Sequence, residues 1–497
     1  MKILFLQPPL GAWATWGVHK VINIGHAQLA GYLREHNPGL VLEALDCRAW
    51  GLNEAQMLER VDQSRPDIVY VGDILHTTGG LAVVFIYNEA ARKVKEKFPH
   101  MKTVAGGIFY ASASEFTMSE NPFIDFCLAG ESEETLSELI KELSKAAPDF
   151  GSVKGLCWRD NGRVTLNAYR PLIKDLDALP MPAYDLFPMD QYVGHTYWKN
   201  YSETWNSRGC PAACTFCYEW GQFDSRGNQD LKQYRFRSAR KVVDEMEILY
   251  DKFGMRVIVM MDDTYNVSRP RMEQTIEECL TRDIKMKWMP LGRAPYFIRD
   301  IDLYPDLRRA GCFMCLVGLE VADDEELRKL KKGITVEQVK ETVAKLREAG
   351  IATVLTWMIG FEEDDEEKIK MRFAAVDEID PDIIALQFLT PIPGSPIWDT
   401  VSKKGIIRFE DLNKKIRQWD FHQPIMPTNH LSIPEIADLG SWAFREFYAK
   451  PGRIQRAMHN RNYDPLVGTC VRDFMNNVGH FQKESHGTQS YVGQQQG

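Results

Sequence analysis

The chain has 497 residues, of which 44% are hydrophobic and 26% charged, and its formal net charge is −9. This length favours two or three domains that each bury a core, in a soluble globular protein of ordinary composition. The acidic balance and the lack of long basic stretches argue against nucleic acid as a partner. No apolar run reaches the roughly 18 residues of a membrane span. The apolar N-terminal stretch breaks at Pro8, too soon for a signal peptide. We therefore expect a cytoplasmic protein without a transmembrane segment.

Residues 1–147 alternate between strand-like and helix-like patterns. Apolar strand patterns occupy 2–6, 41–44, 67–72, 102–105 and 123–129, and helical patterns occupy 26–36, 54–63, 85–98 and 134–146. This alternation predicts an α/β fold with a doubly wound parallel sheet. Such sheets bind ligands beyond the carboxyl ends of their strands. The predicted ends are Gln7–Leu10, Asp46–Trp50, Asp73–Thr78, Gly106–Tyr110 and Gly130–Glu131.

The rest of the chain divides into four parts. Residues 148–200 are expected to form a linker with a small hairpin turning at Asp160-Asn161-Gly162. Residues 201–400 form a second βα array, with strands predicted at 256–261, 286–290, 312–319, 353–359 and 383–389. About six such units predict a partial βα barrel. Residues 401–481 are expected to be mostly helical, and the Gln-, Ser- and Gly-rich tail 482–497 to be disordered.

Three of the ten cysteines, Cys210, Cys214 and Cys217, lie within eight residues in the spacing C-x₃-C-x₂-C. Disulfides are rare in cytoplasmic proteins. Iron–sulfur clusters are held by thiolates, normally four, so three thiolates on one loop can hold three irons and leave a fourth iron open. A zinc site would need a further Cys or His nearby, and none follows within about fifty residues. The spacing indicates an iron–sulfur cluster, with another metal or three unliganded thiols as the alternatives.

This motif, in the form C-x₃-C-x-Φ-C at the opening of a βα barrel, resembles the radical S-adenosylmethionine (SAM) enzymes. The resemblance implies a 4Fe–4S cluster whose open iron is chelated by SAM. One electron, from a donor such as ferredoxin or flavodoxin, would cleave SAM and give a 5′-deoxyadenosyl radical that abstracts hydrogen from a substrate. The resemblance also implies that Phe216 packs near the adenine. Arg293 would contact the SAM carboxylate, with a surface salt bridge as the alternative.

Carboxylates follow two strands of the predicted barrel. Asp262 and Asp263 come after the strand 256–261, where the family places polar groups for the methionine ammonium; a helix N-cap is the alternative for one of them. Glu320 ends the next-but-one strand, where the family binds the SAM ribose hydroxyls. Its alternative partner is a surface lysine such as Lys329 or Lys331.

Cys312 and Cys315 raise the question of a second cluster. They lie three residues apart on a predicted strand, so we expect their side chains to point to opposite faces. Free cysteine is often buried, and core thiols are therefore the preferred interpretation.

A doubly wound N-terminal domain ahead of this barrel is similar to the cobalamin-binding class of radical SAM enzymes. Markers of this class include Pro66-Asp-Ile-Val, Gly106-Gly-Ile and Ala129-Gly-Glu-Ser-Glu-Glu. The resemblance, together with the strand ends, implies cobalamin contacts at Gln7, Thr77, Gly106, Gly107 and Glu131. A sheet domain that no longer binds cobalamin is the alternative.

Within this class, Arg208-Gly-Cys-Pro, Phe216-Cys-x-x-Trp220 and Lys241-Val-Val-Asp-Glu-Met-Glu resemble the anaerobic magnesium-protoporphyrin IX monomethyl ester cyclase group. Three features depart from it. There is no Asp-x-His-x-x-Gly, so no protein histidine would bind cobalt from below. The usual Gly-Gly-x-His reads Gly106-Gly-Ile-Phe109, and the insert 221–233 is longer than in the cyclase.

Two enzymatic functions fit these features. The first is C-methylation of a large, apolar or tetrapyrrole-like small molecule through methylcobalamin, and the second is oxidative ring closure of the cyclase type. Aromatic residues near the expected site suit a large flat substrate or belong to the core: Tyr218, Trp220, Trp288, Tyr296 and Trp357. A non-catalytic iron–sulfur sensor is a third hypothesis, but a sensor needs no SAM site. We could assign no catalytic side chain from the sequence.

Overall fold

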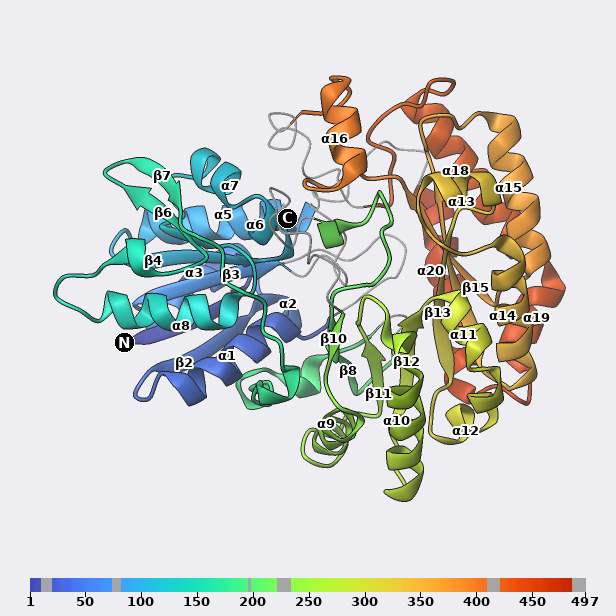
Figure 1. Cartoon of the computed structure of the whole chain (residues 1–497), viewed down its shortest axis with the longest axis horizontal. Helices are drawn as coiled ribbons and strands as arrows, with labels where there is room; N and C mark the ends of the chain where they lie inside the picture. The colour runs from blue at the N-terminus through green and yellow to red at the C-terminus, as the bar shows by residue number, and fades with distance from the viewer. Residues whose placement is uncertain (10–19, 74–81, 195–197, 221–233, 409–420, 485–497) are drawn as a thin grey trace.

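The computed structural model describes the chain except for residues 10–19, 74–81, 195–197, 221–233, 409–420 and 485–497. Two α/β halves and a helical C-terminal region make up the molecule (Figure 1). The N-terminal sheet lies on the left of the view, and the second sheet with its covering helices on the right. The predicted fold class, with its parallel N-terminal sheet, partial βα barrel and mostly helical C-terminal region, is confirmed.

The N-terminal sheet has seven strands in the order β2-β1-β3-β4-β5-β6-β7. The first five strands are parallel: β1 (Lys2–Gln7), β2 (Val41–Asp46), β3 (Ile68–Asp73), β4 (Lys102–Gly107) and β5 (Phe126–Leu128). The hairpin β6 (Leu156–Asp160) and β7 (Arg163–Leu166) pairs antiparallel with β5. The hairpin that we expected in a linker therefore extends this sheet.

Helices cover both faces of the N-terminal sheet because its strands are apolar on both sides. Alternate strand residues pack with α3 (Glu54–Ser64) and α5 (Ala82–Lys97) on one face. The intervening residues pack with α1 (Ile24–His36) and α8 (Ser132–Leu143) on the other. Continuous apolar runs are typical of parallel strands that are buried on both faces. The strands end together at the edge of the sheet that faces the second half of the chain.

The second sheet has six parallel strands in the order β15-β14-β13-β12-β11-β8. They are β8 (Tyr201–Thr204), β11 (Val257–Met260), β12 (Lys287–Gly292), β13 (Met314–Glu320), β14 (Ala352–Ile359) and β15 (Ile383–Phe388). The helices α9 (Ala239–Asp251), α10 (Arg269–Thr281), α14 (Val336–Glu348) and α15 (Glu366–Ile379) pack on one face. Strand β8 was not predicted, because it has only four residues and three of them, Ser202, Glu203 and Thr204, are polar although buried.

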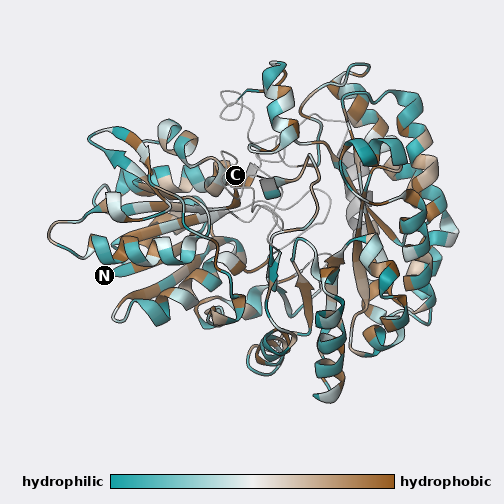
Figure 2. Cartoon of the chain, viewed as in Figure 1, coloured by the Kyte–Doolittle hydropathy of each residue, from teal (hydrophilic) through white to brown (hydrophobic). Residues whose placement is uncertain are grey.

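The C-terminal helices are α16 (Pro396–Lys403), α18 (Ile433–Tyr448), α19 (Pro451–His459) and α20 (Pro465–Glu484). Residues of α19 and α20 pack against the other face of the second sheet. Figure 2 shows the sheets as the hydrophobic interior and the outer helices as largely hydrophilic. Most of the predicted disordered tail lies outside the described residues. None of the described helices combines the length and the hydropathy that a membrane crossing requires.

The expectation for Cys312 and Cys315 was wrong in its geometry. Strand β13 begins only at Met314, so the two-residue alternation does not reach Cys312. The two sulfur atoms lie 3.7 Å apart, and both side chains are fully buried. They are core thiols, as predicted, but they face each other.

Candidate active site

The three clustered cysteines lie on the loop that follows β9 (Ser207–Arg208), at the carboxyl end of β8. Cys214 is buried, and Cys210 and Cys217 are half-buried. The sulfur of Cys210 lies 3.3 Å from the hydroxyl of Thr264, which follows β11. The loop is also anchored through Thr215, whose amide donates to the carbonyl of Leu330 at 3.0 Å. The thiols therefore face the carboxyl ends of the barrel strands, where βα barrels carry their chemistry.

The surroundings of these thiols fit a 4Fe–4S cluster. Among the described residues, no three Cys, His, Asp or Glu side chains converge tightly enough to hold a single metal ion. A cluster does not need such convergence, because each thiolate binds a different iron. Burial raises the pKa of the Cys210 and Cys217 thiols, so both are protonated at neutral pH until a metal displaces the proton. Arg293 places a guanidinium nitrogen 3.6 Å from the sulfur of Cys214, a contact that stabilises a thiolate.

A second group of side chains lies beside the cysteine loop and joins Arg293 to Glu320. The ammonium of Lys332 is 2.8 Å from a carboxylate oxygen of Glu320 and 5.9 Å from the ring centre of Phe216. Arg293 donates to the carbonyl of Lys332. The structure therefore brings together three of the predicted SAM residues, Phe216, Arg293 and Glu320, around one buried lysine.

Among the described residues, neither Glu320 nor Arg293 forms the surface salt bridge that the sequence analysis gave as its alternative role. Glu320 pairs with neither Lys329 nor Lys331 in the described structure but with Lys332, which is only 5% exposed. Arg293 is 9% exposed and lies under the loop, not on the surface. Glu320 itself has φ 71°, at an irregularity in the pairing of β13 with β14. Such left-handed geometry is uncommon outside glycine and turns the carboxylate away from the regular strand direction.

The two aspartates after β11 have different surroundings. Asp262 is 1% exposed and accepts hydrogen bonds from the amide of Asn206 at 3.2 Å and from the hydroxyl of Ser207. Burial raises its pKa to about 6. Asp263 accepts a hydrogen bond from the hydroxyl of Tyr218 and lines the pocket described next. Asp262 therefore braces the barrel, whereas Asp263 is the aspartate that a ligand can reach.

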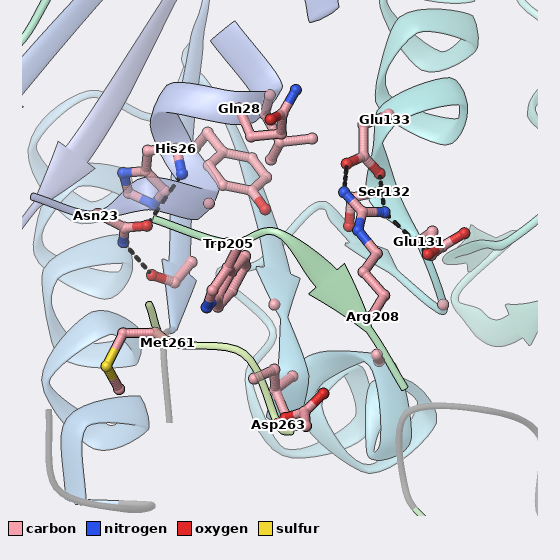
Figure 3. Close-up of a pocket in the computed structure, with 18 of the residues that line it drawn as sticks. Asn23, His26, Gln28, Glu131, Ser132, Glu133, Trp205, Arg208, Met261 and Asp263 are labelled. Atoms are coloured by element: carbon pink, nitrogen blue, oxygen red, sulfur yellow. Dashed lines mark hydrogen bonds and ion pairs between the residues drawn. The ribbon is translucent and has the colours of Figure 1, made fainter. Parts of the chain in front are cut away.

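An open pocket lies between the carboxyl ends of the N-terminal strands and the loops after β8 and β11. Figure 3 shows Trp205 inside it, Arg208 reaching to Glu131 and Glu133, and Asp263 at the lower edge of the view. Four glycines line the pocket: Gly25, Gly72, Gly107 and Gly130. Glycines let a bulky ligand approach the backbone closely. Cobalamin in this pocket would contact both halves of the chain.

Only some of the predicted cobalamin residues line this pocket. Gly107 and Glu131 line it. Gly106 lies beneath the ring of Tyr70, where a Cβ atom would come within 2.4 Å of the tyrosine hydroxyl. Gln7 is 2% exposed at the end of β1 and is not among the lining residues. Thr77 lies outside the described residues, as does the insert 221–233.

The lining residues of the pocket include one histidine, His26. It is 1% exposed and lies in the first turn of α1, where its ring packs edge-on against Tyr70 with 5.3 Å between ring centres. Burial lowers its pKa to about 3. This ring belongs to the core wall of the pocket and does not follow the Asp-x-His-x-x-Gly pattern.

Sequence reasoning missed several residues of the site. Lys332 is buried and follows the exposed Lys331, and the sequence alone does not indicate which of the two lysines is buried. Trp205 and Arg235 also lacked a motif that would single them out, and Glu133 was not singled out although it lies within the marker Ala129-Gly-Glu-Ser-Glu-Glu. Conversely, Trp288 and Trp357 are fully buried core residues and cannot contact a substrate.

Comparisons with known proteins agree with this geometry. Residues 207–374 match the Radical SAM superfamily, and residues 18–140 match the B12 binding domain. The chain is 27% identical to an uncharacterised methyltransferase of Pyrococcus horikoshii, over 91% of this chain and 93% of that protein. It is 26% identical to the anaerobic magnesium-protoporphyrin IX monomethyl ester cyclase of Rubrivivax gelatinosus, over 96% of this chain and 82% of the cyclase.

Solved structures show the same fold. The radical SAM methyltransferase TsrM of Kitasatospora setae superposes with a TM-score of 0.68 at 16% identity, covering 98% of this chain and 99% of TsrM. The cobalamin-dependent radical SAM enzyme OxsB also gives a TM-score of 0.68 at 16% identity, covering 97% of this chain and 71% of OxsB. With a B12 binding domain and a radical SAM domain, the chain is a cobalamin-dependent radical SAM enzyme.

Proposed function

We propose that this enzyme methylates a carbon atom of a large, apolar or tetrapyrrole-like small molecule. The observation that carries the proposal is that one pocket joins the two halves of the chain. Its walls include Gly107 and Gly130 of the cobalamin-binding domain, together with Ser207 and Arg208, which directly precede the Gly209-Cys210 step. A reaction that uses both cobalamin and SAM requires the two cofactors to face the same cavity.

We assign the cluster to Cys210, Cys214 and Cys217 and the SAM site to Phe216, Asp263, Arg293, Glu320 and Lys332. When bound, the cluster supplies the electron that cleaves SAM, and cobalamin supplies the methyl group. The chain's own side chains orient the reactants. Lys332 holds one oxygen of Glu320 at 2.8 Å and leaves the other oxygen for the ribose hydroxyls of SAM. A one-electron donor such as ferredoxin or flavodoxin would complete the system.

The second candidate is oxidative ring closure. It is favoured by the similarity to the cyclase of Rubrivivax gelatinosus, which extends over 96% of this chain. The methyltransferase relative from Pyrococcus horikoshii aligns over nearly as much, so overall similarity does not choose between the two reactions.

Methyl-labelled SAM separates the two reactions. The reconstituted, reduced enzyme would be incubated with deuteromethyl-SAM and magnesium-protoporphyrin IX monomethyl ester, and the products analysed by mass spectrometry. A porphyrin that gains the deuteromethyl group supports methylation of a tetrapyrrole. A porphyrin that gains oxygen and loses hydrogen without label supports the cyclase.

The cobalamin recovered from the same reaction gives a readout that needs no substrate. Deuteromethyl label on cobalamin with an unchanged porphyrin supports a methylase with a different substrate. Absence of label from both, in enzyme that holds iron and cobalamin, contradicts the proposal. The Cys210→Ala, Cys214→Ala, Cys217→Ala triple variant serves as the control for label that moves without the cluster.

A further inference from the structure

Two short strands close the segment that carries the cysteines. Strand β9 (Ser207–Arg208) pairs antiparallel with β10 (Arg235–Phe236), and the three cysteines lie between these two strands in the sequence. Arg208 is directly opposite Arg235 in this pairing. Like charges opposite each other destabilise a sheet. The loop therefore has two facing arginines at its base, and they need an anion between them.

That anion comes from the other domain. One carboxylate oxygen of Glu131 accepts from Arg208 at 2.9 Å and from Arg235 at 2.9 Å. The other oxygen accepts from the amide of Ile173 at 2.6 Å and from Arg235 at 3.1 Å. Glu133 binds the second terminal nitrogen of Arg208 (Figure 3). A single carboxylate thus bonds to both ends of the cysteine segment.

The position of Glu131 makes this contact firm. The side chains of Glu131 and Arg235 are 9% and 7% exposed, so water screens the pair weakly. Glu131 immediately precedes helix α8, and Glu133 lies in its first turn, where the helix dipole favours negative charge. Gly130 has φ 77°, a conformation that glycine adopts without strain, and this turn presents Glu131 to the barrel.

The same residues form a wall of the cobalamin pocket. Glu131, Glu133 and Arg208 all line it, and Arg208 is two residues before Cys210. We propose that Glu131 is a positioning residue: its carboxylate fixes both ends of the cysteine segment to the cobalamin-binding domain and so sets the separation between cluster and cobalamin. This role rests on the assignment of the three cysteines to the cluster.

The test compares Glu131→Gln with Glu134→Gln in the full-length protein. Glu134 lies on the same helix but pairs with Arg170 of its own half, and its side chain is 45% exposed. The first measurement is hydrogen exchange of residues 207–220 in protein without cofactors. The glutamine side chain in Glu131→Gln can accept only as a neutral group, so we expect exchange about tenfold faster in this variant and unchanged in the control. Equal exchange in both variants overturns the proposal.

The second measurement uses protein loaded with cluster and cobalamin. The electron paramagnetic resonance (EPR) signal of cob(II)alamin is recorded while the cluster is reduced. The magnetic interaction between the cluster and cob(II)alamin depends on the distance between them. Glu131→Gln should keep the iron and cobalamin content of the wild type and show a weakened or broadened interaction. An unchanged interaction overturns the positioning role. A wild type that binds no iron instead refutes the cluster assignment, which the exchange measurement does not use.

A milder variant guards against misfolding. Arg235→Lys keeps the positive charge, but one terminal nitrogen of Arg235 contacts both Glu131 and the carbonyl of Ile173, the latter at 2.7 Å, and the shorter lysine side chain places its nitrogen differently. If Glu131→Gln gives no folded protein, Arg235→Lys should show faster exchange of residues 207–220, by about threefold, consistent with loss of one bond of the pair. Wild-type exchange in a folded Arg235→Lys protein then overturns the proposal.

Discussion

Replacing Glu320 by glutamine tests the buried pair that we propose to lie at the SAM site. The pair with Lys332 has an N–O distance of 2.8 Å, and its side chains are 12% and 7% exposed for Glu320 and Lys332. Deleting one partner of a buried ion pair typically costs about 3–5 kcal/mol because the other charge is left buried. The glutamine oxygen still accepts from Lys332, so only the charge is lost. We therefore expect the free energy of unfolding to fall by about 1.5–3 kcal/mol, the range for hydrogen bonds to charged groups.

The affinity for SAM should fall as well. A carboxylate accepts both ribose hydroxyls as charge-assisted bonds, and the amide of glutamine has only one acceptor oxygen. A loss of about 1.5–3 kcal/mol, the range for hydrogen bonds to charged groups, corresponds to a rise of about tenfold to somewhat over a hundredfold in the dissociation constant. Equilibrium binding of SAM to reconstituted protein measures it, with iron content determined on the same samples.

The matched control is Glu325→Gln. Glu325 pairs with Lys329 on the surface, with side chains 67% and 60% exposed, respectively. Water screens such an exposed pair and it contributes little, so neither stability nor SAM affinity should change measurably. If Glu320→Gln binds SAM as tightly as this control at normal iron content, Glu320 is not part of the SAM site.

Three further predictions concern the cobalamin-binding half. In EPR spectra of full-length protein with cob(II)alamin, no hyperfine splitting from a protein histidine should appear; such splitting would show that the absence of Asp-x-His-x-x-Gly misled us. Because burial lowers the pKa of His26 from 6.5 to about 3, only the unfolded chain takes up this proton between those values. Unfolding free energy should therefore fall by about 1.4 kcal/mol per pH unit below about pH 6, and in cofactor-free His26→Gln protein this part of the slope should be missing. Gly106→Ala should destabilise by about 1–3 kcal/mol through overpacking, since its Cβ atom would lie 2.4 Å from the Tyr70 hydroxyl; Gly452→Ala, with open space around the Cβ, is the control.

The sequence was sufficient for features that depend on local pattern. Apolar runs with flanking helical periodicity predicted both sheets, and the short cysteine spacing singled out the loop after β9 as the candidate cluster loop. Glu320 was found because it ends an apolar strand. Prediction failed where tertiary contacts decide. The start of β13 at Met314 brought the sulfurs of Cys312 and Cys315 to 3.7 Å. From the sequence we began this strand at Cys312, two residues too early, and therefore placed the two side chains on opposite faces.

The missed residues share a physical reason. Lys332 and Arg235 are charged side chains that are buried only because carboxylates from distant parts of the sequence meet them. Glu320 is 12 residues from Lys332, and Glu131 is 104 residues from Arg235. No local pattern records such pairs. The markers Gly130-Glu131 and Arg208-Gly-Cys were visible in the sequence, but only the fold shows that they bind each other.

We predict that this chain cleaves SAM at a cluster held by Cys210, Cys214 and Cys217. The most direct test is the formation of 5′-deoxyadenosine after anaerobic reconstitution and reduction, measured beside iron content. We predict about four irons per chain, from a four-iron cluster with three protein thiolates, and 5′-deoxyadenosine from the wild type. The triple Cys→Ala variant should lack both. A triple variant that keeps the iron chromophore, or a wild type with full iron content that never yields 5′-deoxyadenosine, would contradict the account.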